Sequence, residues 1–307
     1  TLDPRNYSEA ELERIARAYS EAISPLIGEK IDIPAPDVNT NGKIMSWMVD
    51  AYENVVKHSA PGVFTGKPVE FGGSLARTEA TGYGVNFAAV QALEKLGKDV
   101  KGATYAIQGF GNVGYHTGYY AHKAGAKIVA VSTVDVAIYN ENGLDMEAII
   151  KEFQTKGFIT NEAGYGKEIS NAELLALDVD VLAPCALENQ LTSENAGKVR
   201  AKIVVEGANG PTTPEADVIL RQNGVLVVPD ILANCGGVVV SYFEWVQNLQ
   251  GYYWEFDEVQ EKETVVLRRA FRDIWNLAQE YDVDLRTASY MMSIRRVEKA
   301  MKLRGWY

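Results

Sequence analysis

Three glycines near the middle of the chain have the spacing of a turn that binds a dinucleotide. Gly109, Gly111 and Gly114 form the pattern GxGxxG where an apolar, strand-like run ends and a helical run begins. In such a turn the first glycine permits a tight reversal, the second lets the backbone approach a pyrophosphate, and the third lets the helix pack on the strand. Together with Asn112 and Val113 of the same stretch, these glycines are the predicted cofactor-binding turn.

One acidic residue indicates which dinucleotide the turn prefers. The apolar run over residues 127–132 predicts the next strand, and Asp135 follows it, roughly 20 residues after the glycines, where an acid meets the adenosine ribose. A carboxylate there hydrogen-bonds the ribose hydroxyls and repels a 2′-phosphate, and neither arginine nor lysine stands beside it to attract NADP. We therefore expect NAD, with NADP possible. In the alternative interpretation, Asp135 is an ordinary loop carboxylate.

A second candidate for chemistry lies nearer the N-terminus. Pro34 and Pro36 fix their own φ angles and bias the preceding residues toward extended geometry, so the segment that ends at Asp37 is stiff. A carboxylate that is held in place before substrate arrives is suited to general acid–base catalysis. The competing interpretation is that Asp37 only caps a turn before the next helix.

Polar residues also follow predicted strands later in the chain, where doubly wound sheets bind their ligands. Asn209 can donate to a nicotinamide carboxamide or ribose, although Asn-Gly-Pro is also a good turn sequence. Asn234 closes the next such loop and precedes a helix whose free backbone N–H groups favour an anion. Ser241 lies in the first turns of that helix, within reach of a carboxylate, although a lone helical serine is usually structural.

The elements that must position these residues alternate in type over the middle of the chain. Five apolar runs predict strands, and helical patterns separate them. The predicted strands cover residues 104–108, 127–132, 179–183, 202–206 and 225–228. Strands that are apolar on both faces and alternate with helices are typical of a doubly wound, Rossmann-like parallel sheet, so we predict an α/β fold.

A loop-rich stretch over residues 62–74 separates this sheet from what precedes it. We predict a first domain over residues 1–72, a dinucleotide-binding domain over residues 73–236, and C-terminal helices over residues 237–307. Helices without strands cannot extend a parallel sheet, so we expect the last part to pack back on the first domain and complete it.

Composition limits the classes of function. The 307 residues carry 41 acidic against 30 basic side chains, and this net charge of -11 argues against a nucleic-acid partner. No run is long enough to cross a bilayer, and the first residues show no export signal, so we expect a cytoplasmic protein without a membrane partner. The two cysteines lack CxxC spacing and the three histidines lack metal-ligand spacing, so we expect neither a disulfide framework nor a metal site.

Taken together, these stretches resemble the glutamate dehydrogenases of the hexameric bacterial and archaeal type, within the Glu/Leu/Phe/Val dehydrogenase family. The resemblance covers essentially the whole chain, and its motifs are specific in combination. They are Asp32–Asn41, Thr65–Pro68, Gly72–Leu75, Arg77 with Glu79–Gly82, Gln108–Gly114, Ala208–Thr212 and Ser241–Asn248.

The resemblance implies NAD(P)-dependent, reversible oxidative deamination of L-glutamate to 2-oxoglutarate and ammonia. Asp37 matches the family's catalytic aspartate, which shuttles the proton of the amine or ammonia. Arg77 and Thr81 match residues of the cleft where the nicotinamide lies, Thr81 as the partner of its carboxamide. Residues 1–72 then represent the remainder of a domain for substrate binding and oligomerisation.

Further positions match the family's substrate site. Asn209 and Asn234 match residues near the nicotinamide ribose and the substrate. Val238 and Ser241 match residues that line the pocket for the side-chain carboxylate of glutamate. The implied partners are therefore small molecules and further copies of the chain.

Two departures from the family pattern bear on activity. The family usually has an acid where this chain has Thr133, so the preference for NAD rests on Asp135. Family members also begin well before Thr1, with a segment that carries a glycine-rich motif, the lysines that bind both substrate carboxylates, and much of the subunit contact surface. We therefore expect this chain to bind nucleotide, and we expect turnover and a homohexamer in the intact protein.

Two other functions stay open at this point. A leucine, valine or phenylalanine dehydrogenase shares the architecture but has an apolar side-chain pocket, and Ser241 with the Phe243-Glu244-Trp245 stretch favours glutamate. A nucleotide-binding fragment without catalysis is the alternative from a different functional class.

Overall fold

The structure, a computed structural model, describes residues 2–37 and 39–305, and these residues divide into two compact units. Unit 1 comprises residues 1–78 and 237–263, and unit 2 comprises residues 79–236 and 264–307. Each unit folds around its own set of buried apolar side chains.

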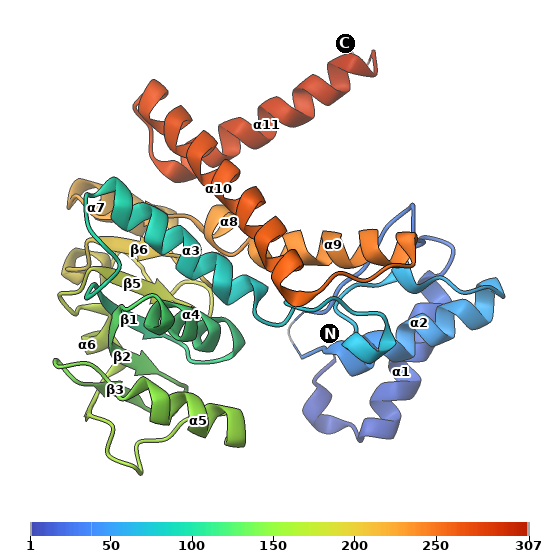
Figure 1. Cartoon of the computed structure of the whole chain (residues 1–307), viewed down its shortest axis with the longest axis horizontal. Coiled ribbons are helices and arrows are strands. Elements are labelled where there is room, and N and C mark those ends of the chain that lie inside the picture. The colour runs from blue at the N-terminus through green and yellow to red at the C-terminus, as the bar shows by residue number, and fades with distance from the viewer. Residues whose placement is uncertain (1, 38, 306–307) are drawn as a thin grey trace. The chain divides into compact units, whose positions relative to one another are not determined.

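Unit 1 is helical over the part of the chain that the structure describes. Its elements are α1 (Glu9–Ile23), α2 (Gly42–Val56), most of α9 (Gly236–Gln250), the start of α10 (Phe256–Tyr281) and short 3-10 helices at Pro4–Asn6, Pro61–Val63 and Val69–Phe71 (Figure 1). A capping box begins α1, with the Ser8 N–H donating to Glu11 Oε2 at 2.8 Å. The side chain of Asn41 caps α2 by accepting the Ile44 N–H at 3.1 Å. Helices α1 and α2 pack on each other to form the core of unit 1.

Seven strands of the described residues form one sheet in unit 2. They are β1 (Thr104–Gln108), β2 (Lys127–Ser132), β3 (Ala137–Tyr139), β4 (Lys167–Ile169), β5 (Val181–Pro184), β6 (Ile203–Val205) and β7 (Leu226–Val228). Their order is β4-β3-β2-β1-β5-β6-β7, and β2, β1, β5, β6 and β7 run parallel. The chain leaves β1 toward β2 and later returns to its other side with β5, as in a doubly wound sheet. The predicted α/β fold class is confirmed.

The sheet is mixed rather than purely parallel, which differs from the prediction. β3 pairs antiparallel with β2, and β4 pairs antiparallel with β3. A tight turn joins β2 to β3, in which the Thr133 N–H donates to the Val136 carbonyl at 2.7 Å. Each added strand has three residues, too few for an alternating pattern to stand out in the sequence.

Helices cover both faces of this sheet. The remaining elements are α3 (Ala80–Lys95), α4 (Asn112–Lys123), α5 (Met146–Lys156), α6 (Asn171–Leu175), α7 (Pro214–Gln222), α8 (Asp230–Ala233), α11 (Leu285–Leu303) and a 3-10 helix at Ala196–Lys198 (Figure 1). Side chains alternate along β1: Tyr105 and Ile107 join one core with α3, α4 and α5, whereas Ala106 joins a second core with α6 and α7. Burial on both faces accounts for the continuous apolar runs of the strands.

The C-terminal helices differ from the expectation that all of residues 237–307 pack on the first domain. Residues 237–263 group with unit 1, but residues 264–307 group with unit 2. Phe271 and Leu277 of α10 and Leu285 of α11 belong to the larger core of unit 2, together with side chains of α3. A helix can pack on the layer that covers a sheet without extending the sheet.

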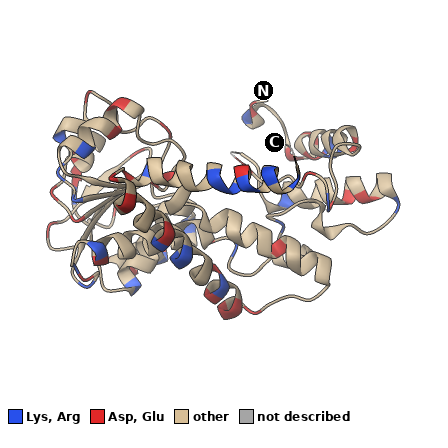
Figure 2. Ribbon diagram, turned by 90° about the horizontal axis from the view of Figure 1, so that it is seen from above, with Lys and Arg blue, Asp and Glu red and all other residues tan. Residues whose placement is uncertain are grey.

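Basic side chains gather at the end of α11 (Figure 2). Between residues 295 and 304 five side chains are basic and one, Glu298, is acidic, although the net charge of the chain is -11. Lys302 pairs with Glu298 at 2.6 Å, and cations in the last turns of a helix favour the negative end of its dipole. Lys302 in the last turn and Arg304 at the C-cap thus stabilise the helix end. Neither α11 nor any other helix of the described residues is long and apolar enough to span a membrane.

Asp180, directly before β5, links the amino ends of neighbouring strands. Its carboxylate accepts the Thr104 N–H at 2.9 Å and the Lys202 ammonium at 3.1 Å, and it pairs with Lys98. Asp180 is only 4% exposed. Burial raises the pKa of its carboxyl group, but these donors outweigh that effect and hold the pKa at about 2.

We expect Asp180→Asn to lower the free energy of unfolding by about 2 kcal/mol at pH 7, since one pKa unit corresponds to about 1.4 kcal/mol. The folded-state pKa lies below the unfolded value, so this contribution is present above about pH 4 and is lost as the pH falls toward 2. Urea unfolding at pH 7 and at lower pH measures the difference. Asp178→Asn, which removes an exposed carboxylate, is the control. An equal deficit of Asp180→Asn at every pH would contradict the explanation.

Candidate functional site

The glycine turn after β1 has the steric features that its spacing predicts. Gly109 has a φ of +86°, and a Cβ atom there would lie 2.6 Å from Ala186 Cα. A Cβ atom on Gly114 would lie 1.9 Å from the Gly109 carbonyl oxygen, so α4 packs on the turn only because residue 114 is glycine. A Cβ atom on Gly111 would meet nothing within 4 Å, which leaves the outer side of the turn open.

Ser132, at the end of β2, fixes this turn to the sheet. Its carbonyl accepts the Phe110 N–H at 2.6 Å, and its Oγ accepts the Gly109 N–H at 3.2 Å. Helix α4 then begins at Asn112 with Gly111 as its N-cap residue, so the first-turn N–H groups lack partners within the helix. The sequence analysis missed Ser132, although its position at the end of the second predicted strand was a usable signal.

The loops that follow β1, β5 and β6 meet at one end of the sheet. A Cβ atom on Gly207, after β6, would lie 2.4 Å from Cys185 Sγ, after β5, and 3.3 Å from Val113 Cγ1, after β1. This end holds the carboxyl termini of the parallel strands, where doubly wound sheets bind ligands. Burial raises the pKa of the Cys185 thiol to about 12, so the thiol is protonated at neutral pH and is no nucleophile.

The structure brings together two predicted site residues at this edge. Asn234 Nδ2 donates to Asn209 Oδ1 at 2.7 Å and to the Gly207 carbonyl at 3.2 Å. Asn209 is exposed, its oxygen accepts from Asn234, and its amide NH₂ can donate to a ligand.

A buried carboxylate that the sequence analysis missed anchors the Asn209 loop. Glu206 is 0% exposed, and its Oε1 accepts from Arg286 Nη2 at 2.6 Å. Its Oε2 accepts the Asp230 N–H at 2.8 Å, and Asp230 in turn accepts the Gly210 N–H at 2.8 Å. Burial raises the pKa of Glu206, and the Arg286 guanidinium opposes that change. The network fixes both sides of the loop that presents Asn209.

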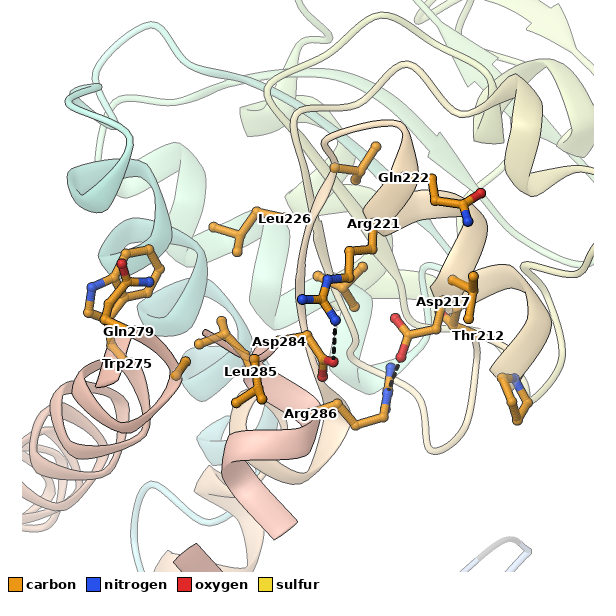
Figure 3. Close-up of a pocket in the computed structure, with 16 residues that line it drawn as sticks. Thr212, Asp217, Arg221, Gln222, Leu226, Trp275, Gln279, Asp284, Leu285 and Arg286 are labelled. Atoms are coloured by element: carbon orange, nitrogen blue, oxygen red, sulfur yellow. Dashed lines mark hydrogen bonds and ion pairs between the residues drawn. The ribbon is translucent and has the colours of Figure 1, made fainter. Parts of the chain in front are cut away.

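The same arginine borders a pocket of about 790 Å³ between α7, β7, α10 and α11. Figure 3 shows two ion pairs in its wall, Arg286 with Asp217 at 2.6 Å and Arg221 with Asp284 at 3.4 Å. Trp275 supplies an aromatic face. Because each arginine in the lining is paired with an aspartate, the pocket lacks a cation ready to receive an anion.

Thr81 lies in the first turn of α3, next to the contact between α3 and α4. A Cβ atom on the neighbouring Gly82 would lie 2.5 Å from His116 Cβ and 2.6 Å from the Val113 carbonyl. The beginning of α3 therefore packs against the beginning of α4, beside the glycine turn.

Asp135 occupies the turn between β2 and β3. It is exposed, its N–H donates to Thr133 Oγ1 at 3.2 Å, and the neighbouring Val134 is fully exposed. Thr133 thus shapes the turn, and Asp135 lies at its tip. Its role in choosing NAD stays a prediction.

In unit 1, the backbone of Asp37 begins a turn. Thr40 Oγ1 accepts the Asp37 N–H at 2.6 Å, and the Thr40 N–H donates to the Asp37 carbonyl at 2.9 Å. The main chain of Asp37 forms the turn and its side chain is exposed, so a catalytic role for this carboxylate stays a prediction.

Two further predicted residues meet in unit 1. Arg77 Nε donates to Ser241 Oγ at 2.8 Å. Ser241 is 8% exposed, whereas Val238, one turn earlier on α9, is 68% exposed. Burial lowers the pKa of Arg77, and the carboxylates of Glu244 and Glu263 oppose this change. The serine is thus held by an arginine before any substrate arrives.

Known families match almost all of the chain. Residues 72–305 match the Glutamate/Leucine/Phenylalanine/Valine dehydrogenase family, and residues 1–54 match the Glu/Leu/Phe/Val dehydrogenase dimerisation domain. The chain is 54% identical to the NAD-specific glutamate dehydrogenase of Clostridioides difficile, over 100% of this chain and 74% of that protein.

Solved structures agree with these matches. The glutamate dehydrogenase of Peptoniphilus asaccharolyticus has a TM-score of 0.86 and 43% identity, over 100% of this chain and 73% of that one. The hetero-hexameric glutamate dehydrogenase of Thermus thermophilus, in its Leu-bound form, has a TM-score of 0.93 and 34% identity, over 100% and 72%. The resemblance inferred from the motifs is confirmed. Because the two family matches together span nearly the whole sequence, this chain belongs to the Glutamate/Leucine/Phenylalanine/Valine dehydrogenase family.

Proposed function

We propose that the protein catalyses the NAD-dependent, reversible oxidative deamination of L-glutamate. L-glutamate, water and NAD⁺ give 2-oxoglutarate, ammonium, NADH and a proton. The observation that carries the proposal is the 54% identity, over 100% of this chain, to a protein named NAD-specific glutamate dehydrogenase. Relatives in Bacillus subtilis and Staphylococcus aureus with 46% and 47% identity bear the same NAD-specific description.

The geometry of the glycine turn fits a dinucleotide. Space beside Gly111 admits a pyrophosphate, and the first turn of α4 offers backbone N–H donors to it. Bound NAD supplies the acceptor for the hydride that leaves the α-carbon of glutamate. Asn209 and Thr81 bind its nicotinamide end in this proposal, and Asp135 binds its adenosine ribose. NADP use stays possible because Asp135 lies at the tip of a turn rather than on a strand.

Asp37 is the proposed catalytic residue. Its carboxylate takes a proton from the α-amino group of glutamate during deamination and returns it to that group in the reverse reaction. The proline-stiffened segment and the Asp37–Thr40 turn support this role, since they fix the backbone on both sides of the side chain.

Ser241, with Asn234 and Val238, is proposed to select the substrate. A hydroxyl held by Arg77 provides a polar partner for the side-chain carboxylate of glutamate. A leucine, valine or phenylalanine dehydrogenase would need an apolar surface at this position.

The proposal extends to assembly and location. The match of residues 1–54 to a dimerisation domain and the hetero-hexameric relative in Thermus thermophilus support an oligomer, which we propose is a homohexamer. A cytoplasmic location stays a prediction.

The test of the proposal is an assay of the full-length protein. We expect NAD reduction with L-glutamate, and much slower reduction with L-leucine, because Ser241 favours a carboxylate. Absorbance at the NADH band follows the reaction. Faster oxidation of leucine than of glutamate would show that the substrate is an apolar amino acid. NADH binding without oxidation of either amino acid would favour a nucleotide-binding protein without catalysis.

We expect Gly114→Ala to weaken NADH binding at least tenfold, about 1.4 kcal/mol, since the added methyl group would lie 1.9 Å from the Gly109 carbonyl oxygen and must push α4 away. Calorimetric titration with NADH measures the affinity. Gly197→Ala is the matched control, because a Cβ atom there meets nothing within 4 Å. An unchanged dissociation constant would mean that NADH binds elsewhere.

We expect Asp37→Ser to reduce kcat for glutamate by roughly 100-fold or more, the scale of general acid–base catalysis. NADH affinity is expected to stay the same, because the proposed nucleotide turn belongs to the other unit. Asp32→Ser, which removes another exposed acid of the same segment, is the control. Retained activity of Asp37→Ser would leave Asp37 as a turn residue only.

A further inference from the structure

Unit 1 contains a buried ion pair next to the loop that contacts the Asp37 segment. Lys67 and Glu244 have side chains that are 0% exposed, and Lys67 Nζ lies 2.7 Å from Glu244 Oε1. Lys67 Nζ also donates to the Phe64 carbonyl at 2.6 Å and to Asn248 Oδ1 at 2.8 Å. An ammonium has three donors, so all of them are used inside the protein. Lys67 is therefore unsuited to bind a substrate carboxylate.

The carboxylate of Glu244 binds backbone N–H groups as well as the Lys67 ammonium. Its Oε2 accepts the Gly66 N–H at 2.8 Å, and its Oε1 accepts the Lys67 N–H at 3.2 Å. Gly66 has a φ of +77°, in the left-handed region that favours glycine. Burial lowers the pKa of the Lys67 ammonium, and the Glu244 carboxylate opposes this change.

The loop of residues 65–67 packs on the segment that carries Asp37. A Cβ atom on Gly66 would lie 2.5 Å from the Cδ and Cγ atoms of Pro36, so the loop backbone packs directly on the proline ring. The Thr65 N–H donates to the Pro34 carbonyl at 3.1 Å. The residue that follows Pro36 is Asp37. A chain of direct contacts thus runs from Glu244 through Gly66 and Pro36 to the proposed catalytic carboxylate.

The same face of α9 also holds the loop that ends at Arg77. Ser241, Glu244 and Asn248 are three and four residues apart, the spacing of one helix face. Asn248 Nδ2 donates to the Gly72 carbonyl at 2.7 Å, and Ser241 accepts from Arg77. One helix therefore fixes both the Asp37 segment and the loop that ends at Arg77.

We propose that Glu244 and Lys67 are positioning residues, which act through Gly66 and Pro36 to hold Asp37 where it transfers the proton. This inference rests on the proposed function. A buried ion pair is costly, and apolar residues of similar volume often give equal or better stability. An apolar pair cannot replace the hydrogen bonds to the loop backbone, so the role assigned here is placement of the loop rather than stability.

The experiment compares three variants of the full-length protein. They are Glu244→Gln, Lys67→Met, and the double variant Lys67→Met with Glu244→Met. Each single variant leaves a buried group without its charged partner, so we expect a lower Tm and a kcat at least tenfold lower. The double variant removes both charges but leaves the loop N–H groups of residues 66 and 67 without their acceptor, so we expect the Tm to recover in part while kcat stays low. KM for glutamate and the dissociation constant of NADH are expected to change less than threefold.

Ser20→Ala is a control that distinguishes misplacement of Asp37 from a general loss of stability of the folded protein. Ser20 is buried in α1, where its Oγ donates to the Met48 carbonyl of α2 at 2.6 Å. We expect a lower Tm with unchanged kcat. If the double variant recovers kcat together with Tm, the pair is purely structural and the inference is wrong. An unchanged kcat in folded Glu244→Gln would overturn it too.

Two controls distinguish failure of this inference from failure of the proposed function. A wild-type protein that does not oxidise glutamate, or an active Asp37→Ser variant, overturns the proposed function and this inference with it. If the wild-type protein is active and its activity depends on Asp37, but the double variant is also active, only the inference is overturned.

Discussion

The contact between Gly114 and the carbonyl of Gly109 is the steric constraint on which the nucleotide end of unit 2 depends. With no side chain at either residue, α4 starts directly against the turn after β1, and the turn stays close enough to β2 for Ser132 to hold it. The lack of a side chain at Gly109 lets the backbone after β5 pack closely against it, and the lack of one at Gly207 does the same for Cys185. Three loops from three parallel strands can therefore converge, which they could not do around larger residues.

Buried carboxylates hold the functional loops in both units. In unit 2, Glu206 joins Arg286 to the loop that presents Asn209, and in unit 1, Glu244 joins Lys67 to the loop that packs on Pro36. Both carboxylates are 0% exposed, and both accept backbone N–H groups besides a cation. The two oxygens of a carboxylate can accept hydrogen bonds from a cation and from loop N–H groups at the same time. A buried carboxylate can therefore hold irregular backbone in place where no water reaches it.

The sequence predicted those features that depend on neighbours in the chain. β1 and β2 have the bounds that the apolar runs indicate, because a run of apolar residues is a local signal. It did not predict β3 or β4, which are short and form by pairing with residues already in the sheet. Arg286 and Lys67 were also missed, since their partners lie 80 and 177 residues away and no local pattern reports such distances.

The two short edges of the sheet bear on how the protein behaves at high concentration. β4 and β7, at the two ends of the strand order, have three residues each, and Lys167 and Glu168 of β4 are exposed. A short edge with charged side chains offers few unpaired backbone groups to the edge of another molecule. The antiparallel addition of β3 and β4 thus ends the sheet on a strand that resists aggregation, so β2 with its buried apolar residues is never the outermost strand.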